Sequence, residues 1–88
     1  MIEKSVTIAN KLGLHARPAA LFVKTASQFV SDIFLMKDGM KVNGKSIMGV
    51  MMLAAECGSD ITIRADGPDG EAAIEALKAL IDSKFNEE

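Results

Sequence analysis

Residues 13–29, GLHARPAALFVKTASQF, mark the point where the spacing of apolar side chains changes from that of a strand to that of a helix. The preceding segment, residues 2–9, carries apolar residues on one parity, namely Ile2, Val6 and Ile8. From Ala16 onward they recur at helical spacing, at Ala19, Phe22, Val23, Ala26 and Phe29. We therefore predict a half-buried strand, a loop over residues 10–14, and a helix with Pro18 in its first turn, where the missing N–H costs little.

Further elements follow from the rest of the chain. Residues 32–36 and 41–43 are apolar or β-branched and flank the turn Lys37-Asp38-Gly39-Met40, and Asp-Gly between such runs is typical of a hairpin. Residues 60–66 alternate cleanly, which predicts a strand whose inward side chains are Ile61, Ile63 and Ala65. A short helix is expected from Ser46 to about Leu53, with Gly58 ending that segment.

A last helix is expected to run to about Phe85. Its apolar stripe is Ala73, Ile74, Leu77, Leu80 and Ile81. The element order is then β-α-β-β-α-β-α. Four strands with one alternating apolar face predict an α+β fold, in which one sheet is covered by helices on a single side.

Composition limits the classes of function. The 88 residues predict one domain, and a net charge of −2 argues against a protein that binds nucleic acid by neutralising phosphates. The lone Cys57 excludes an internal disulfide and a cysteine metal cluster, and we interpret it as a small apolar filler. The longest apolar run, residues 47–55, is far shorter than the about 20 residues that span a bilayer. A cytoplasmic protein that does not contact membranes is expected.

His15 is the only histidine, and it lies where the first helix is predicted to begin. A lone histidine in this position is most often a surface or capping residue. The neighbours favour a functional interpretation, because a helix N-terminus offers unpaired N–H donors to an anion and Arg17 adds planar donors that match phosphate oxygens. His15 would then be a nucleophile that accepts a phosphoryl group.

The chemistry that the chain lacks is equally informative. There is no phosphate-binding loop of the GxxxxGKS or GxGxxG type, and one histidine cannot build a multi-histidine metal site. No metal or cofactor is expected. The donor and the acceptor of the phosphoryl group must therefore be other proteins, which describes a carrier and not a self-contained enzyme.

Two motifs carry a resemblance to a known family. GLHARPAALFV (residues 13–23) and KSIMGVMML (residues 45–53) resemble the active-site and regulatory-serine segments of HPr, the histidine-containing phosphocarrier of the bacterial phosphoenolpyruvate:sugar phosphotransferase system. The likeness covers essentially the whole chain, so it implies a single HPr domain over residues 1–88. It implies an open-faced β-sandwich with an antiparallel sheet of order 1-4-2-3 and three helices on one face.

The resemblance also implies roles for individual residues. His15 would be phosphorylated on Nδ1 by Enzyme I and would pass the group to IIA domains of sugar permeases, while Arg17 steadies it. The regulatory-serine segment resembles that of HPr proteins from low-GC Gram-positive bacteria, which implies that Ser46 would be phosphorylated from ATP by HPr kinase/phosphorylase. This form would act as a corepressor with catabolite control protein A. Ile47, Met48 and Met51 would contact partner proteins beside His15. A monomer is implied.

The residues themselves leave some of these roles open. Ser46 is expected to cap its helix whether or not a kinase modifies it. The apolar residues of segment 47–53 cannot all face a core, so some are expected to stay exposed, and for Met52 we favour loose surface packing.

Three other functions are compatible with parts of the sequence pattern. A ferredoxin-like RNA-binding module has the same element order but needs stacking aromatics on the open sheet face, where Phe34 alone is expected. A small hydrolase using His15 as a base would lack a second catalytic group. A regulatory or nitrogen-linked paralogue that is not coupled to sugar uptake is the nearest alternative.

Overall fold

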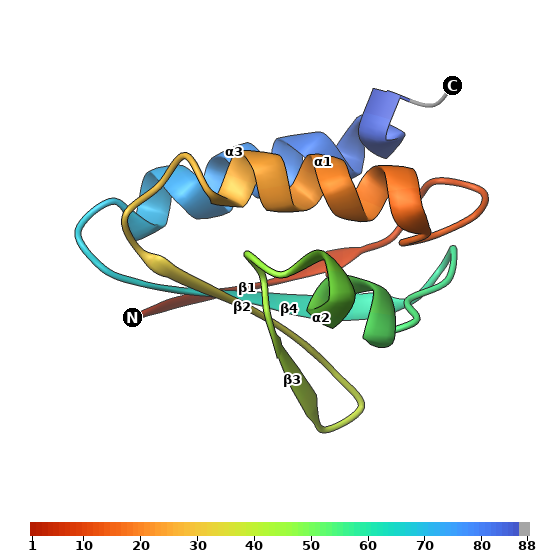
Figure 1. Cartoon of the computed structure of the whole chain (residues 1–88), viewed down its shortest axis with the longest axis horizontal. Helices are drawn as coiled ribbons and strands as arrows, with labels where there is room; N and C mark the ends of the chain where they lie inside the picture. Colours follow the sequence, from red (N-terminus) through yellow and green to blue (C-terminus); the bar gives the residue numbers. More distant parts are fainter. Residues whose placement is uncertain (87–88) are drawn as a thin grey trace.

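A four-stranded antiparallel sheet in the order β1-β4-β2-β3 carries the helices on one face (Figure 1). The computed structural model describes residues 1–86. The strands are β1 (Ile2–Thr7), β2 (Asp32–Lys37), β3 (Met40–Asn43) and β4 (Asp60–Asp66), and the helices are α1 (Ala16–Ala26), α2 (Ile47–Met52) and α3 (Gly70–Asp82), followed by a 3₁₀ turn, η1 (Lys84–Asn86). The predicted α+β fold and strand order are confirmed. The predicted domain over 1–88 includes two residues outside the described range.

The core lies between the sheet and the helices. Strand β4 lies between β1 and β2, and its predicted inward residues Ile61, Ile63 and Ala65 are all buried. They join Ile33 and Leu35 of β2, and the helices supply Ala19, Phe22 and Ala26 from α1 and Ala73, Leu77 and Ile81 from α3. Figure 1 shows α1 and α3 side by side across the sheet. Burial of large aliphatic and aromatic side chains, about 1.5–3 kcal/mol each, makes this core the main stabilising element.

The hairpin between β2 and β3 forms as its sequence predicts. Asp38 and Gly39 both have positive φ, 50° and 82°, which is the backbone of a type I′ turn.

On the open face of the sheet, the ammonium of Lys41 lies 4.6 Å from the ring centroid of Phe34. Among the described residues Phe34 is the one aromatic side chain on this face, so the stacking platform of an RNA-binding module is absent from that part of the chain.

The end of α2 differs from the prediction. The helix ends at Met52, and Ala54 takes the left-handed conformation, φ 53°, that terminates it. Gly58 instead lies in the turn before β4, where its N–H donates to the carbonyl of Ile8 at 2.8 Å. The expectation that Gly58 ends the helical segment is therefore wrong, because this glycine serves a contact between the loop and the end of β1.

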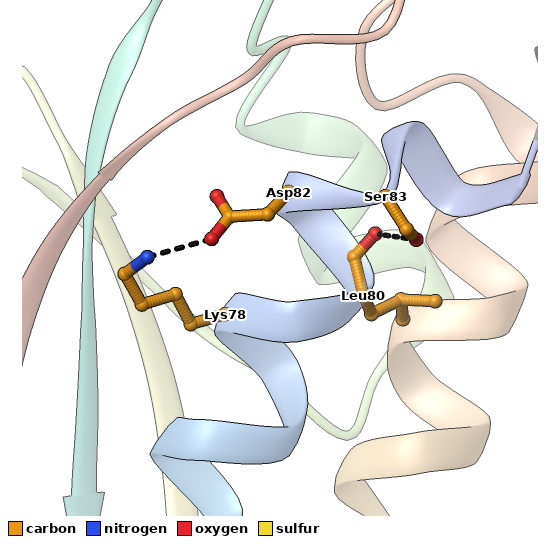
Figure 2. Close-up of polar contacts among 4 residues, drawn as sticks. All are labelled: Lys78, Leu80, Asp82 and Ser83. Atoms are coloured by element: carbon orange, nitrogen blue, oxygen red, sulfur yellow. Dashed lines mark hydrogen bonds and ion pairs between the residues drawn. The ribbon is translucent and has the colours of Figure 1, made fainter.

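The end of α3 also differs. The helix stops at Asp82 and does not continue to Phe85. The backbone leaves the helix because Lys84, Phe85 and Asn86 take positive φ of 58°, 55° and 59°. Figure 2 shows the hydroxyl of Ser83 donating to the carbonyl of Leu80 at 2.7 Å, which satisfies an acceptor of the last helical turn. Lys78 and Asp82 form an ion pair of 2.6 Å on the last turn. Phe85 follows with a positive φ of 55° and is buried, so the chain reverses to place its ring in the core.

Candidate phosphoryl-transfer site

His15 is the N-cap residue of α1. Its backbone is extended, with φ −77° and ψ −173°, and its carbonyl accepts the N–H of Ala19 at 2.9 Å as the first intrahelical bond. The side chain is half-buried and makes no capping hydrogen bond to the helix. The backbone N–H groups of Ala16 and Arg17 lie in the first turn, where no intrahelical carbonyl is available to them. The imidazole therefore lies beside the donor end of a helix, as predicted.

The loop that precedes His15 has little conformational freedom. Gly13 has a φ of 68°, and a Cβ on this residue would lie 2.3 Å from the carbonyl oxygen of Ala55. The neighbouring Leu14 is buried and donates its N–H to that same oxygen at 2.9 Å. Only glycine fits at this position, because its φ lies in the left-handed region and a Cβ would clash with the backbone of Ala55. The loop is thus pinned to residues 55–56, which follow α2.

Arg17 lies in the first turn of α1 and is exposed. Ala16 and Ala20, which are also exposed, are small. A guanidinium on this turn has room to approach a group held on His15, and its planar donors suit phosphate oxygens. The structure thus places both predicted residues, His15 and Arg17, at one end of one helix.

Ser46 is the N-cap residue of α2. Its Oγ accepts the N–H of Gly49 at 3.1 Å, so the predicted cap is present. The preceding Lys45 is held on two sides: its N–H donates to Oδ1 of Asn43 at 2.9 Å, and its ammonium donates to the carbonyl of Phe29 at 2.7 Å. The start of α2 is therefore tied to the turn after α1.

The apolar residues of α2 divide between two environments. Val50 and Leu53 are buried in the core. The side chains that stay exposed, here called the methionine patch, are Ile47, Met48, Met51 and Met52, with Met48 72% and Met52 65% accessible. Since α2 packs against α1, the patch lies on the helix next to the one that His15 caps. The expectation of an exposed apolar surface is met.

Charge is unevenly distributed, and the residue-by-residue reading missed this. No Asp or Glu occurs in residues 4–31 or 39–55, which include α1 and α2 together with β3 and most of β1, whereas residues 56–82 contain seven. The basic residues of the acid-free segments are Lys4, Lys11, Arg17, Lys24, Lys41 and Lys45. Of these residues, Arg17 and Lys24 lie on α1 and Lys45 precedes α2, whereas Lys4 lies on β1 and Lys41 on β3. Helix α1 therefore carries basic and no acidic side chains, and this cationic side around α1 suits an acidic partner surface. Counting acids along the chain would have found this signal. It adds the exposed Lys24, in the last turn of α1, to the cationic side around α1 but not to the site at His15.

Cys57 is exposed, so the prediction that it fills an apolar position is wrong. It lies in the turn between α2 and β4, and its thiol is 3.7 Å from the carbonyl oxygen of Ala9.

Within residues 1–86, no cluster of three or more His, Cys, Asp or Glu side chains is arranged to hold a metal ion. No helix in the same range is long and apolar enough to cross a membrane.

A half-exposed histidine at a helix N-terminus, with an arginine in the first turn of that helix and an exposed apolar patch on the adjacent helix, defines a small phosphocarrier domain. The sequence model of the family described as "PTS HPr component phosphorylation site" matches residues 2–83. The chain belongs to this HPr family of the phosphotransferase system. Its relatives include proteins named phosphocarrier protein HPr, which are carriers and not catalysts, and the chain is accordingly not an enzyme.

Individual relatives agree with this assignment. Phosphocarrier protein HPr of Treponema pallidum is 51% identical, and the match covers 100% of both chains. The crystal structure of HPr from Thermoanaerobacter tengcongensis is 57% identical, with a TM-score of 0.96 over 100% of this chain and 99% of that one. Crh of Bacillus subtilis, named for catabolite repression and solved as a swapped dimer, is 50% identical, with a TM-score of 0.77 over 96% of this chain and 97% of that one.

Proposed function

We propose that the chain accepts a phosphoryl group on Nδ1 of His15 from phosphorylated Enzyme I and passes it to IIA domains of sugar permeases. The observation that supports this most directly is the position of His15 as the N-cap of α1. In the transfer, the lone pair of Nδ1 forms a bond to phosphorus while the bond from phosphorus to the donor protein breaks, and the ring proton stays on Nε2. The second transfer reverses these roles with the acceptor domain.

The surroundings of His15 suit a group whose charge is spread over three oxygens. The N–H groups of Ala16 and Arg17 and the field of α1 favour an anion. The guanidinium of Arg17 contributes planar donors. These interactions hold and orient the phosphoryl group, and phosphoryl transfer needs little more than positioning and charge stabilisation.

The test is incubation with Enzyme I and radiolabelled phosphoenolpyruvate. We expect label that is acid-labile and base-stable, that His15→Ala abolishes, and that moves to a IIA domain on mixing. Label that survives in His15→Ala, or label that is stable to acid, would contradict the proposal. Release of inorganic phosphate without any partner protein would favour the small hydrolase instead.

The methionine patch and the cationic side around α1 are proposed as the docking surface for Enzyme I and the IIA domains. Ile47, Met48 and Met51 supply adaptable apolar contact, and Arg17 and Lys24 supply charge that attracts acidic partners.

We further propose that the chain works in the cytoplasm as a monomer and a single domain. Lys4 supports the monomer, since it lies on edge strand β1 opposite the inward residue Ile63 and an inward-directed charge discourages pairing of sheet edges. A dimer in light scattering at micromolar concentration would contradict it.

We propose a second, regulatory phosphorylation at Ser46 by HPr kinase/phosphorylase, with the product acting as corepressor with catabolite control protein A. The half-buried hydroxyl accepts the N–H of Gly49, so a dianion there would be favourably placed on α2 and would add negative charge beside the docking surface. The expected result is label from ATP and the kinase that Ser46→Ala abolishes. If Enzyme I phosphorylates the chain but no IIA domain of a sugar permease accepts the group, the regulatory or nitrogen-linked paralogue is favoured.

A further inference from the structure

Asn10 is a fully buried polar residue in the loop that leads to His15. Its Nδ2 donates to the carbonyl of Gly13 at 2.7 Å. The backbone carbonyl of Asn10 accepts the N–H of Gly13 at 3.2 Å. Burying an amide costs free energy unless its hydrogen bonds are made, so a buried asparagine in a short loop indicates a conformation that these bonds specify.

The bond from Asn10 holds one particular peptide group. The carbonyl of the peptide that joins Gly13 to Leu14 accepts from Asn10, and the N–H of the same peptide donates to the carbonyl of Ala55 at 2.9 Å. This peptide is therefore fixed at both of its polar ends. The next peptide, between Leu14 and His15, carries the backbone nitrogen of His15. The orientation of the Gly13–Leu14 peptide therefore sets the direction in which the His15 backbone enters α1.

We propose that Asn10 is a positioning residue for phosphoryl transfer to His15, a role that rests on the function proposed above. It orients the Gly13–Leu14 peptide, and through it aligns the imidazole with the N–H groups of Ala16 and Arg17. Asn10 is buried and cannot touch a partner protein. Its loss should therefore change the rate of transfer within the docked complex and leave docking unchanged.

The experiment compares Asn10→Asp and Asn10→Ala with the wild-type protein in steady-state phosphorylation by Enzyme I and phosphoenolpyruvate. Asn10→Asp nearly preserves shape, but its carboxylate accepts and does not donate. We expect kcat to fall about tenfold, because small misplacements of reacting groups are costly, while KM for this protein stays within about twofold. In NMR spectra, the amide signals of Ala16 and Arg17 and the ring signals of His15 should shift in both variants.

Ser31→Ala is the matched control. Ser31 is the other buried polar residue among those described, and it follows the opposite end of α1, so its loss perturbs stability without touching the His15 loop. All rates are measured well below the lowest melting temperature. An unchanged kcat in Asn10→Asp would overturn the proposal, and so would an equal fall in Ser31→Ala.

A measurement on the wild-type protein needs no variant. The Nδ2 protons of Asn10 should stay protected from hydrogen exchange both before and after phosphorylation, and lost protection in the phosphorylated form would overturn the positioning role. A wild-type protein that takes no label on His15 would end the proposed function itself. The NMR comparison would then still decide whether Asn10 fixes the orientation of His15.

Discussion

Asp69 accepts two hydrogen bonds from Ser31, one from its backbone N–H at 2.9 Å and one from its hydroxyl. The other carboxylate oxygen accepts the N–H of Val30 at 2.9 Å. The residue before α3 is thus bonded to the loop between α1 and β2, and it joins segments that are 38 positions apart. The pKa of Asp69 is lowered from its ordinary value, mainly by the hydrogen bond from the hydroxyl of Ser31 and next by that from the N–H of Val30.

This bonding predicts a pH-dependent loss of stability in Asp69→Asn. A lowered folded-state pKa means that the ionised carboxylate stabilises the fold above the ordinary aspartate pKa of about 4, and that this contribution is lost as the pH falls through the folded-state value. Melting temperatures from pH 7 to pH 2 should show a gap between wild type and Asp69→Asn that closes in acid. Asp66→Asn, at the exposed end of β4, is the control. A gap that is constant with pH would contradict the argument.

Gly13→Ala is predicted to be more damaging than Gly39→Ala. Both glycines have positive φ, so both substitutions carry left-handed strain on the order of 1–2 kcal/mol. A Cβ at Gly39 meets nothing within 4 Å, whereas one at Gly13 would lie 2.3 Å from the carbonyl oxygen of Ala55. Urea unfolding should therefore show the larger loss for Gly13→Ala, and only that variant should be phosphorylated more slowly. Equal losses would show that the loop moves aside.

Ser46→Ala and Ser46→Asp are predicted to separate the effect of helix capping on stability from the effect of negative charge on docking. Alanine removes the acceptor for the N–H of Gly49 and should cost about 1 kcal/mol in the free energy of unfolding. Aspartate is a good cap, so Ser46→Asp should be about as stable as wild type. Its negative charge beside the docking surface should raise KM with Enzyme I, while Ser46→Ala should not. Urea unfolding and steady-state kinetics measure the two effects. An unchanged KM for Ser46→Asp would contradict the proposal that negative charge at this position opposes docking.

Met48→Ala is predicted to weaken docking without loss of stability. The Met48 side chain is 72% exposed, so its truncation should change the free energy of unfolding by less than about 0.5 kcal/mol. If the methionine patch meets partner proteins, KM for Enzyme I should rise severalfold at unchanged kcat. Met40→Ala, on the β2–β3 hairpin and outside the methionine patch, is the matched exposed methionine. Identical kinetics for the two variants would remove the patch from the docking surface.

Arg17→Ala is predicted to slow phosphoryl transfer itself. Loss of one donor that stabilises transition-state charge typically costs about 10²–10³ in kcat for a buried site, and about ten- to hundredfold is expected for exposed Arg17. Arg17→Lys should recover part of the rate, since it keeps the charge but loses the planar donors. Lys24→Gln, farther along α1, should change the salt dependence of KM and leave kcat as it is. Single-turnover labelling distinguishes these results, and equal kcat in wild type and Arg17→Ala would refute the role.

The sequence alone determined the features that depend on neighbours a few positions away. The change of apolar spacing at Ala16 located α1, the Asp38-Gly39 pair located the hairpin, and Ser46 marked the start of α2. These predictions held because hydrogen bonds of turns and caps, and the faces of helices and strands, are decided within one or two turns of chain. The strand order followed from the resemblance between GLHARPAALFV, residues 13–23, and a known family, and not from periodicity.

Only the tertiary structure decided the features that depend on contacts distant in sequence. The carbonyl of Ala55 pins the loop before His15, Asp69 bonds Ser31, and Cys57 lies exposed although its type favours burial. The reversal that buries Phe85 likewise depends on the core above the sheet. No periodicity encodes such pairings, because the free energy that fixes them comes from packing and hydrogen bonds between segments that meet only once the sheet and the helices have assembled.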